Sequence, residues 1–89
     1  MSLEVRYLRL SKGAVRPREV VGVYFTIFNK TERNVYAKCV IKVDGVVARE
    51  DYTKLIPPYE SYDVADFIVA PDRGGSYRVC VSAEVFRWY

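Results

Sequence analysis

Residues 35–47 read VYAKCVIKVDGVV, and this stretch decides the fold class. Its odd positions up to residue 43 are apolar, and they alternate with a more polar set that includes two lysines. A period of two is the spacing of a β-strand that turns one face to a core and the other to water. Asp44 and Gly45 then suit a two-residue type I′ turn, because both positions of that turn need positive φ. We therefore expect residues 46–53 to fold back on residues 35–43 as a β-hairpin.

The same period of two recurs on both sides of the hairpin. Besides the hairpin strands, the expected strands are residues 4–10, 20–28, 62–69 and 76–85. In the first of these, either Tyr7 or Leu8 continues the apolar phase. In residues 62–69 the phase changes between Ala65 and Asp66, and such a change is how a β-bulge looks in a sequence.

The composition fits one folded domain. With 89 residues, of which 51% are apolar and 15% aromatic, the chain is too short to split and too apolar for disorder. No stretch repeats apolar residues with helical spacing over three turns, so we expect no substantial helix. The pattern predicts an all-β protein, an antiparallel immunoglobulin-like sandwich of six to seven strands, in a single domain over residues 1–89.

Charge and hydropathy bear on location. The net charge is only +3, and the chain has no histidine or glutamine, a depletion typical of proteins from hot environments. No apolar run reaches the roughly 18 residues that a membrane helix needs, and the first residues lack the pattern of a signal peptide. We expect a cytoplasmic protein if the chain is complete, and a cell-surface module if it has been trimmed of an anchor.

Five short motifs follow one another along residues 5–85. They are Val15-Arg16-Pro17-Arg18-Glu19, the strand from Val21 to Ile27 with Asn29, Val43-Asp44-Gly45, Leu55-Ile56-Pro57-Pro58 and Gly75-Ser76-Tyr77-Arg78-Val79. In this order and spacing they resemble the cell-adhesion-related domain of bacteria and archaea (CARDB), an immunoglobulin-like sandwich. The resemblance implies a scaffolding or adhesion module, and it supplies no catalytic residue. Arg18 stands where that family has glycine, so we expect a different turn there, and the chain stops where the family usually continues into another strand.

The two cysteines lie on strands that we expect side by side in one sheet, but in opposite phase. Cys39 shares the inward phase of Ile41, whereas Cys80 shares the outward phase of Arg78. A disulfide needs Cβ atoms about 3.5–4.5 Å apart, which opposite faces of a sheet do not allow. We therefore expect no intrachain bridge, with Cys39 in the core and Cys80 on the outer face or in an interface.

The residue types that catalysis and metal binding require are scarce. Without histidine, two cysteines cannot complete a zinc site, and there is no glycine-rich elbow or phosphate loop. Glu60, Asp63, Asp66 and Asp72 cluster in the sequence, but they lack the glycine-containing loop of a calcium site, so we expect solvated carboxylates. We expect no catalytic residues, metal or cofactor, and infer that the chain is not an enzyme.

Apolar side chains at outward positions are the clearest signal of a partner. If the usual last strand of the sandwich is absent, residues 76–85 form an exposed edge that would accept another chain's strand. We expect a protein-interaction or structural module that self-associates or docks a partner through this strand and the aromatic C-terminus. The expected contact residues are Tyr24, Phe28, Phe86, Trp88 and Tyr89. The alternative is that the aromatic tail folds back over the first two of these within one chain.

A small nucleic-acid-binding protein is the second function that the sequence leaves open. Tyr36, Lys38, Lys42 and Arg78 should share the outer face of one sheet, which places cations beside an aromatic ring. Ordinary solvated lysines fit the mild net charge better, because nucleic-acid binding draws mainly on clustered positive charge.

Overall fold

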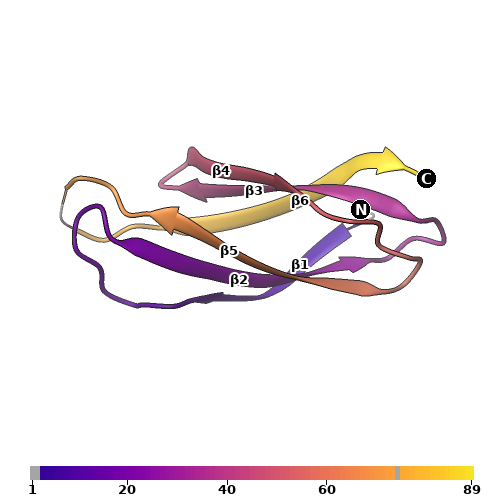
Figure 1. Ribbon diagram of the computed structural model, residues 1–89, viewed down its shortest axis with the longest axis horizontal. Coiled ribbons are helices and arrows are strands. Elements are labelled where there is room, and N and C mark those ends of the chain that lie inside the picture. The colour runs from indigo at the N-terminus through magenta and orange to yellow at the C-terminus, as the bar shows by residue number, and fades with distance from the viewer. Residues whose placement is uncertain (1–2, 74) are drawn as a thin grey trace.

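Each of the two most regular strands forms the centre of a three-stranded sheet in the computed structural model, which describes residues 3–73 and 75–89 (Figure 1). The strands are β1 Leu3–Leu10, β2 Val20–Asn29, β3 Val35–Val43, β4 Val46–Tyr52, β5 Ser61–Val69 and β6 Val79–Trp88. One sheet has the order β1-β2-β5 and the other β4-β3-β6, with every neighbouring pair antiparallel. The prediction of an all-β fold is thus confirmed as six antiparallel strands in two facing sheets. No helix occurs in the described residues, and so none that could cross a membrane.

The core lies between the central strands β2 and β3, because alternate side chains of each point into the space between the sheets. The apolar side chains that are at most 1% exposed are Val23, Phe25, Ile27, Val35, Ala37, Ile41 and Ile56. Burial of each larger one stabilises the fold by about 1.5–3 kcal/mol. On the edge strand β6, the inward residues Val79 and Val81 are only partly buried, so the core thins toward the edges of the sheets.

The turn between β3 and β4 has the backbone that its sequence predicts. Asp44 and Gly45 have φ values of 50° and 81°, and Val43 pairs with Val46. The hairpin prediction is confirmed. Further along, the pairing shifts between Ile41 and Lys42 of β3. Ala48 is the extra residue on β4, and this bulge sets which side chains of β4 face inward.

The bulge expected in β5 is absent, and that prediction is wrong. Pairing with β2 is continuous from Val69 opposite Val20 to Ser61 opposite Phe28. The apolar phase changes in the sequence because Asp66 occupies an inward position, with its side chain only 6% exposed. The phase change therefore reports a buried carboxylate rather than an irregular backbone.

The first strand does contain a bulge, at the position where its sequence is ambiguous. Pairing with β2 shifts between Arg6 and Arg9, and Tyr7 has a φ of 61°. Neither Tyr7 nor Leu8 is buried, since they are 61% and 41% exposed. Because of the extra residue, the inward-facing positions before the bulge and those after it are not in the same alternation.

Arg18 adopts the left-handed backbone that a glycine would adopt with less strain. Its φ is 64°, and its N–H donates to the Ala70 carbonyl at 3.0 Å. The residue at this position thus has the backbone conformation that a glycine would favour. A non-glycine residue in this region costs about 1–2 kcal/mol.

Asn29 ends β2 and joins three segments at one end of the fold. Its side chain is 1% exposed, and Nδ2 donates to the carbonyls of Arg33, Ile56 and Pro57 at 2.8, 3.0 and 3.0 Å. Oδ1 accepts from both the N–H and the hydroxyl of Thr31, at 3.0 and 2.7 Å. Only an amide can donate on one side and accept on the other in this way.

Candidate interaction surface

In the part of the chain that the structure describes, β6 is hydrogen-bonded to β3 alone, while β1 of the facing sheet lies close to β6. No residue in the described ranges pairs with the other edge of β6, so the prediction that it is an edge strand is confirmed (Figure 1). The strand itself differs from the prediction, because it begins at Val79 and continues to Trp88. Phe86 and Trp88 therefore belong to the strand and do not form a separate tail.

The backbone groups of alternate β6 residues point to this open edge. The Asp44 N–H donates to the Arg78 carbonyl at 2.8 Å, so the backbone of residue 78 faces β3. Residues of an antiparallel strand alternate in this direction, so residues 80, 82 and 84 also face β3. The N–H and C=O groups that face outward are those of Val79, Val81, Ala83 and Val85.

The other three edge strands have features that hinder pairing with another chain, whereas β6 does not over most of its length. A bulge with positive φ at Tyr7 interrupts β1, and a bulge at Ala48 interrupts β4. β5 carries the inward charge of Asp66. Bulges and inward charges are the means by which proteins protect sheet edges. β6 pairs regularly with β3 from Val79 to Val85 and shifts register only beyond that point.

Aromatic rings from all three strands and from the end of the chain gather on the outer face of the β4-β3-β6 sheet. We call the four residues Tyr36, Tyr52, Phe86 and Tyr89 the aromatic cluster. Phe86 lies 4.7 Å from Tyr52 and Tyr36 lies 6.4 Å from Tyr89 between ring centroids. Tyr52, Phe86 and Tyr89 are 58%, 59% and 72% exposed. Exposed aromatic area of this kind is typical of protein-binding surfaces.

The structure separates the five contact residues predicted from the sequence. Phe86, Trp88 and Tyr89 lie on the β4-β3-β6 sheet, while Tyr24 and Phe28 are on β2 of the other sheet. Trp88 also stacks with a cation, since the Arg33 guanidinium lies 4.9 Å from its ring centroid. The aromatic end of the chain therefore does not cover the two β2 residues.

Neighbours on their own sheet cover Tyr24 and Phe28 instead. Tyr7 packs edge-on against the Phe28 ring with centroids 6.1 Å apart, and the Arg6 guanidinium lies 4.7 Å from that centroid. The Tyr24 ring lies over Gly22, where a Cβ would be 2.5 Å from its hydroxyl. Both rings are half-buried within the chain.

The residues predicted for nucleic-acid binding do lie near one another. Tyr36, Lys38 and Lys42 are at alternate, outward positions of β3, and Arg78 stands opposite Asp44 just before β6. Carboxylates lie among these cations. Glu50 is 3.7 Å from the Lys38 ammonium, and Glu84 is the register partner of Lys38 on β6.

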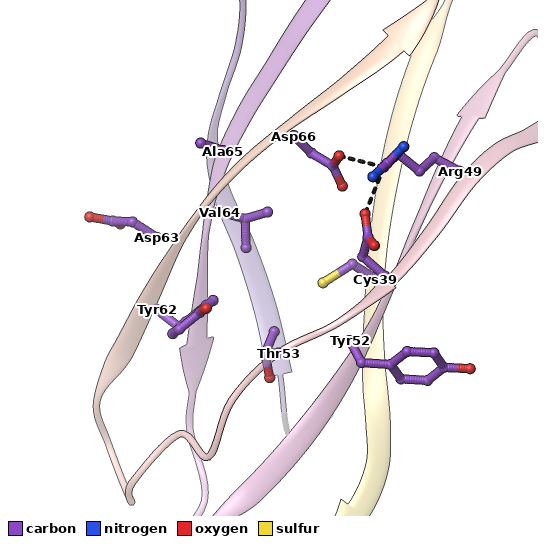
Figure 2. Close-up of a pocket in the computed structure, with 10 residues that line it drawn as sticks. Cys39, Arg49, Tyr52, Thr53, Tyr62, Asp63, Val64, Ala65 and Asp66 are labelled. Carbon is purple, nitrogen blue, oxygen red and sulfur yellow. Dashed lines mark hydrogen bonds and ion pairs between the residues drawn. The ribbon is translucent and has the colours of Figure 1, made fainter.

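The bulge in β4 turns two charged residues toward the inside of the fold, at the gap where β4 faces β5. Arg49 pairs with Ile41 and Asp51 with Cys39, so both share an inward phase. Figure 2 shows the Arg49 guanidinium between Asp66 and a second carboxylate, which is that of Asp51 at 2.8 Å. This group lines a cavity of about 270 Å³ together with Cys39, Thr53 and Tyr62.

The electrostatics of this cavity shift the pKa values of its two carboxyls in opposite directions. Burial and the hydrogen bond with Asp51 raise the pKa of Asp66, whereas the same hydrogen bond, with help from Arg49, lowers the pKa of Asp51. Burial raises the pKa of the Cys39 thiol to about 11, so the thiol is protonated and unreactive at neutral pH. The expectation of solvated carboxylates is thus wrong for Asp66, because the continuous β5 pairing turns it inward.

The remaining predictions about these residue types can be placed on the structure. The two cysteines are free, with Cys39 buried and Cys80 exposed, as their opposite phases predict. Asp63 accepts a hydrogen bond from the Thr26 hydroxyl at 2.7 Å. The described part of the chain holds no group of three or more potential metal ligands.

In comparisons with known proteins, no protein-family model matches the chain, and no curated protein or solved structure matches it significantly.

Proposed function

We propose that the chain is a non-catalytic protein-interaction module with an immunoglobulin-like fold, and that it docks a partner strand along the open edge of β6. The strand order supports the fold assignment. In immunoglobulin-like sandwiches the first, second and fifth strands share one sheet, and the third and sixth share the other. The positions of β1, β2, β5, β3 and β6 agree with this arrangement, and β4 lies beside β3, the position that an additional strand takes in the variable type. They also agree with the fold implied by the resemblance to CARDB.

The regular edge from Val79 to Val85, which is unpaired within the described residues, is the observation that carries the proposal. In immunoglobulin-like folds a seventh strand pairs with the sixth, which is the position beside β6. A partner strand there would meet four residues whose backbone groups point outward. It could form up to about eight backbone hydrogen bonds, each with a net contribution of about 0.5–1.5 kcal/mol.

Backbone pairing alone would not secure a partner. Association costs about 4–15 kcal/mol in lost freedom, which is comparable to the sum of those hydrogen bonds. Affinity therefore needs side-chain contact as well. Phe86 is exposed on β6 and already packed against Tyr52 of β4, so its ring offers that contact with little further loss of side-chain freedom.

A proline substitution at the edge tests the proposal. Val81→Pro removes an N–H that points away from β3, so it leaves the pairing within the sheet intact and blocks strand addition. Val81→Ala is the matched control, because it loses similar side-chain volume and keeps the N–H. Peptides selected from a displayed library of extended sequences should bind the unaltered chain and Val81→Ala but not Val81→Pro. Equal binding to all three chains, or no enrichment of any peptide, would refute docking at this edge.

The alternative is a nucleic-acid-binding surface on the outer face of the same sheet. Its support is that Tyr36, Lys38 and Lys42 share this face with exposed aromatic rings. Titration with single-stranded DNA and RNA in low salt tests it, with charge reversal of Lys38, Lys42 and Arg78 as the comparison. Absence of binding in low salt by the unaltered chain would eliminate this function.

A further inference from the structure

We propose that the strand that β6 accepts is β6 of a second copy of the chain, running antiparallel and centred on Val81. This inference rests on the proposed docking at the β6 edge and specifies its occupant. It would join two three-stranded sheets into one continuous sheet across a two-fold axis. The backbone and the side chains each restrict how two β6 strands can pair.

The backbone restricts the possible registers. Hydrogen bonds form only where outward-facing backbone groups of one strand meet those of the other. On β6 these belong to the odd-numbered residues 79 to 85, because the Arg78 carbonyl is bonded to β3. Every allowed register therefore places odd residues opposite odd residues.

The charges select one of these registers. With Val81 on the two-fold axis, Arg78 stands opposite Glu84 of the second copy, and the reverse pair forms at the other end. Centring on Ser82 places Glu84 opposite Cys80, and centring on Ala83 places it opposite Ser82. Centring on Cys80 places Glu84 opposite Ser76. Among the registers centred on residues 80 to 83, only the Val81 register brings both charged residues of the paired segment opposite an opposite charge, and cross-strand pairs of opposite charge are favourable.

The inward side chains are compatible with the same register. Val79 stands opposite Ala83 of the second copy, so a larger side chain meets a smaller one on each side of the central valines. These residues are partly buried in one chain and pack against its core. Strand addition would cover the side that remains exposed, which is the favourable burial expected of an interface.

The two ends of the paired segment bring Phe86 of the aromatic cluster into the interface. Phe86, which is 59% exposed, would lie just beyond Glu84 and next to Arg78 of the second copy. An arginine beside an aromatic face is a favourable contact. The register shift after Val85 ends the regular pairing there, so the segment has a defined length.

Charge exchange provides the first test. Arg78→Glu and Glu84→Arg each place like charges opposite one another twice in the symmetric dimer. Each should weaken dimerisation about tenfold in sedimentation velocity, and the double variant should regain it. Urea unfolding of each variant separates this effect from a change in the fold. Failure of the double variant to recover would overturn the register.

A cross-link provides the second test and uses a thiol that the chain already has. Cys80 would stand opposite Ser82 of the second copy in a non-hydrogen-bonded pair, where Cβ atoms are about 4.5–5.5 Å apart. A Cys80→Ser, Ser82→Cys variant mixed with the unaltered chain should form a disulfide-linked heterodimer. Each chain oxidised alone should cross-link much more slowly. Equal rates in all three samples would contradict the pairing.

These outcomes remain distinguishable from failure of the proposed function. If the chain stays monomeric at high micromolar concentration while selected peptides bind Val81→Ala and not Val81→Pro, the edge accepts a strand but this inference is wrong. A dimer that persists in Val81→Pro would place the contact elsewhere and would also overturn it. If neither peptides nor a second copy bind, both proposals fail.

Discussion

Replacing Asn29 with alanine should destabilise the fold more than any surface change, although the substitution removes only one small side chain. Five hydrogen bonds end on this amide, which is 1% exposed, and they join the end of β2 to residues 31–33 and 56–57. Alanine would leave three carbonyls without the amide donor and Thr31 without its acceptor. At about 0.5–1.5 kcal/mol for each bond, and more where a group stays buried, the loss is about 3–5 kcal/mol. A domain of this size has about 5–13 kcal/mol in all.

Urea unfolding followed by far-UV circular dichroism measures this loss, with Asn29→Asp as the control. Aspartate keeps the shape and can accept from Thr31, but at neutral pH its carboxylate would face three carbonyl oxygens. Its pKa should rise in the folded state, so Asn29→Asp should regain stability on acidification, whereas Asn29→Ala should not. A loss below about 1 kcal/mol for alanine, or identical pH profiles for the two variants, would refute the assignment of these bonds.

Three further predictions concern a thiol, a carboxyl and a strained turn. At about pH 8, a thiol reagent should modify Cys80 alone in the folded chain and both cysteines in urea. The reason is that Cys39 is buried and its burial raises the pKa of the thiol to about 11. Rapid modification of both cysteines in the folded chain would contradict this. The pKa of Asp66 is raised above its usual 3.8, so its stabilising contribution is present at low pH and is lost as the pH rises through the folded pKa. The unfolding free energy of Asp66→Asn relative to the unaltered chain should therefore rise as the pH increases from below 3.8 toward neutrality, and parallel profiles would count against it. Because Arg18 has a φ of 64°, Arg18→Gly should raise the unfolding free energy by about 1 kcal/mol in urea, and Arg18→Ala should not. Equal unfolding free energies for the glycine variant and the unaltered chain would contradict strain at this turn.

The sequence is informative where one strand has a single unbroken phase. The buried residues of β2 and β3, the opposite faces of the two cysteines and the Asp44-Gly45 turn all follow from a period of two and from turn chemistry. The sequence also predicts that the last strand lies at an edge of its sheet, and β6 is at the end of the order β4-β3-β6. These features are local, or depend only on which strands are central.

The prediction fails where one residue breaks the phase, because a sequence does not show whether the backbone or the side chain is the exception. At Asp66 the backbone is regular and a carboxylate is turned inward, although the sequence suggested a bulge. At Ala48 the reverse holds, and nothing in the sequence marks the bulge. A one-residue shift exchanges the two faces of a strand. Tyr52, which lies opposite Lys38 because of the bulge, was therefore missed.

The Ala48 bulge links the two features that distinguish the β4-β3-β6 sheet. Without it, the Asp44-Gly45 turn would place Tyr52 opposite Ala37, on the inward side, and Asp51 opposite Lys38, on the outward side. With it, Tyr52 reaches Phe86 on the outer face, while Arg49 and Asp51 turn inward to meet Asp66. The same residue interrupts the edge of β4, which hinders pairing there. One extra residue thus places an ion-paired group between β4 and β5 and brings Tyr52 against Phe86 on the outer face. It also interrupts the β4 edge, whereas β6 keeps regular pairing and an uncharged inward face from Val79 to Val85.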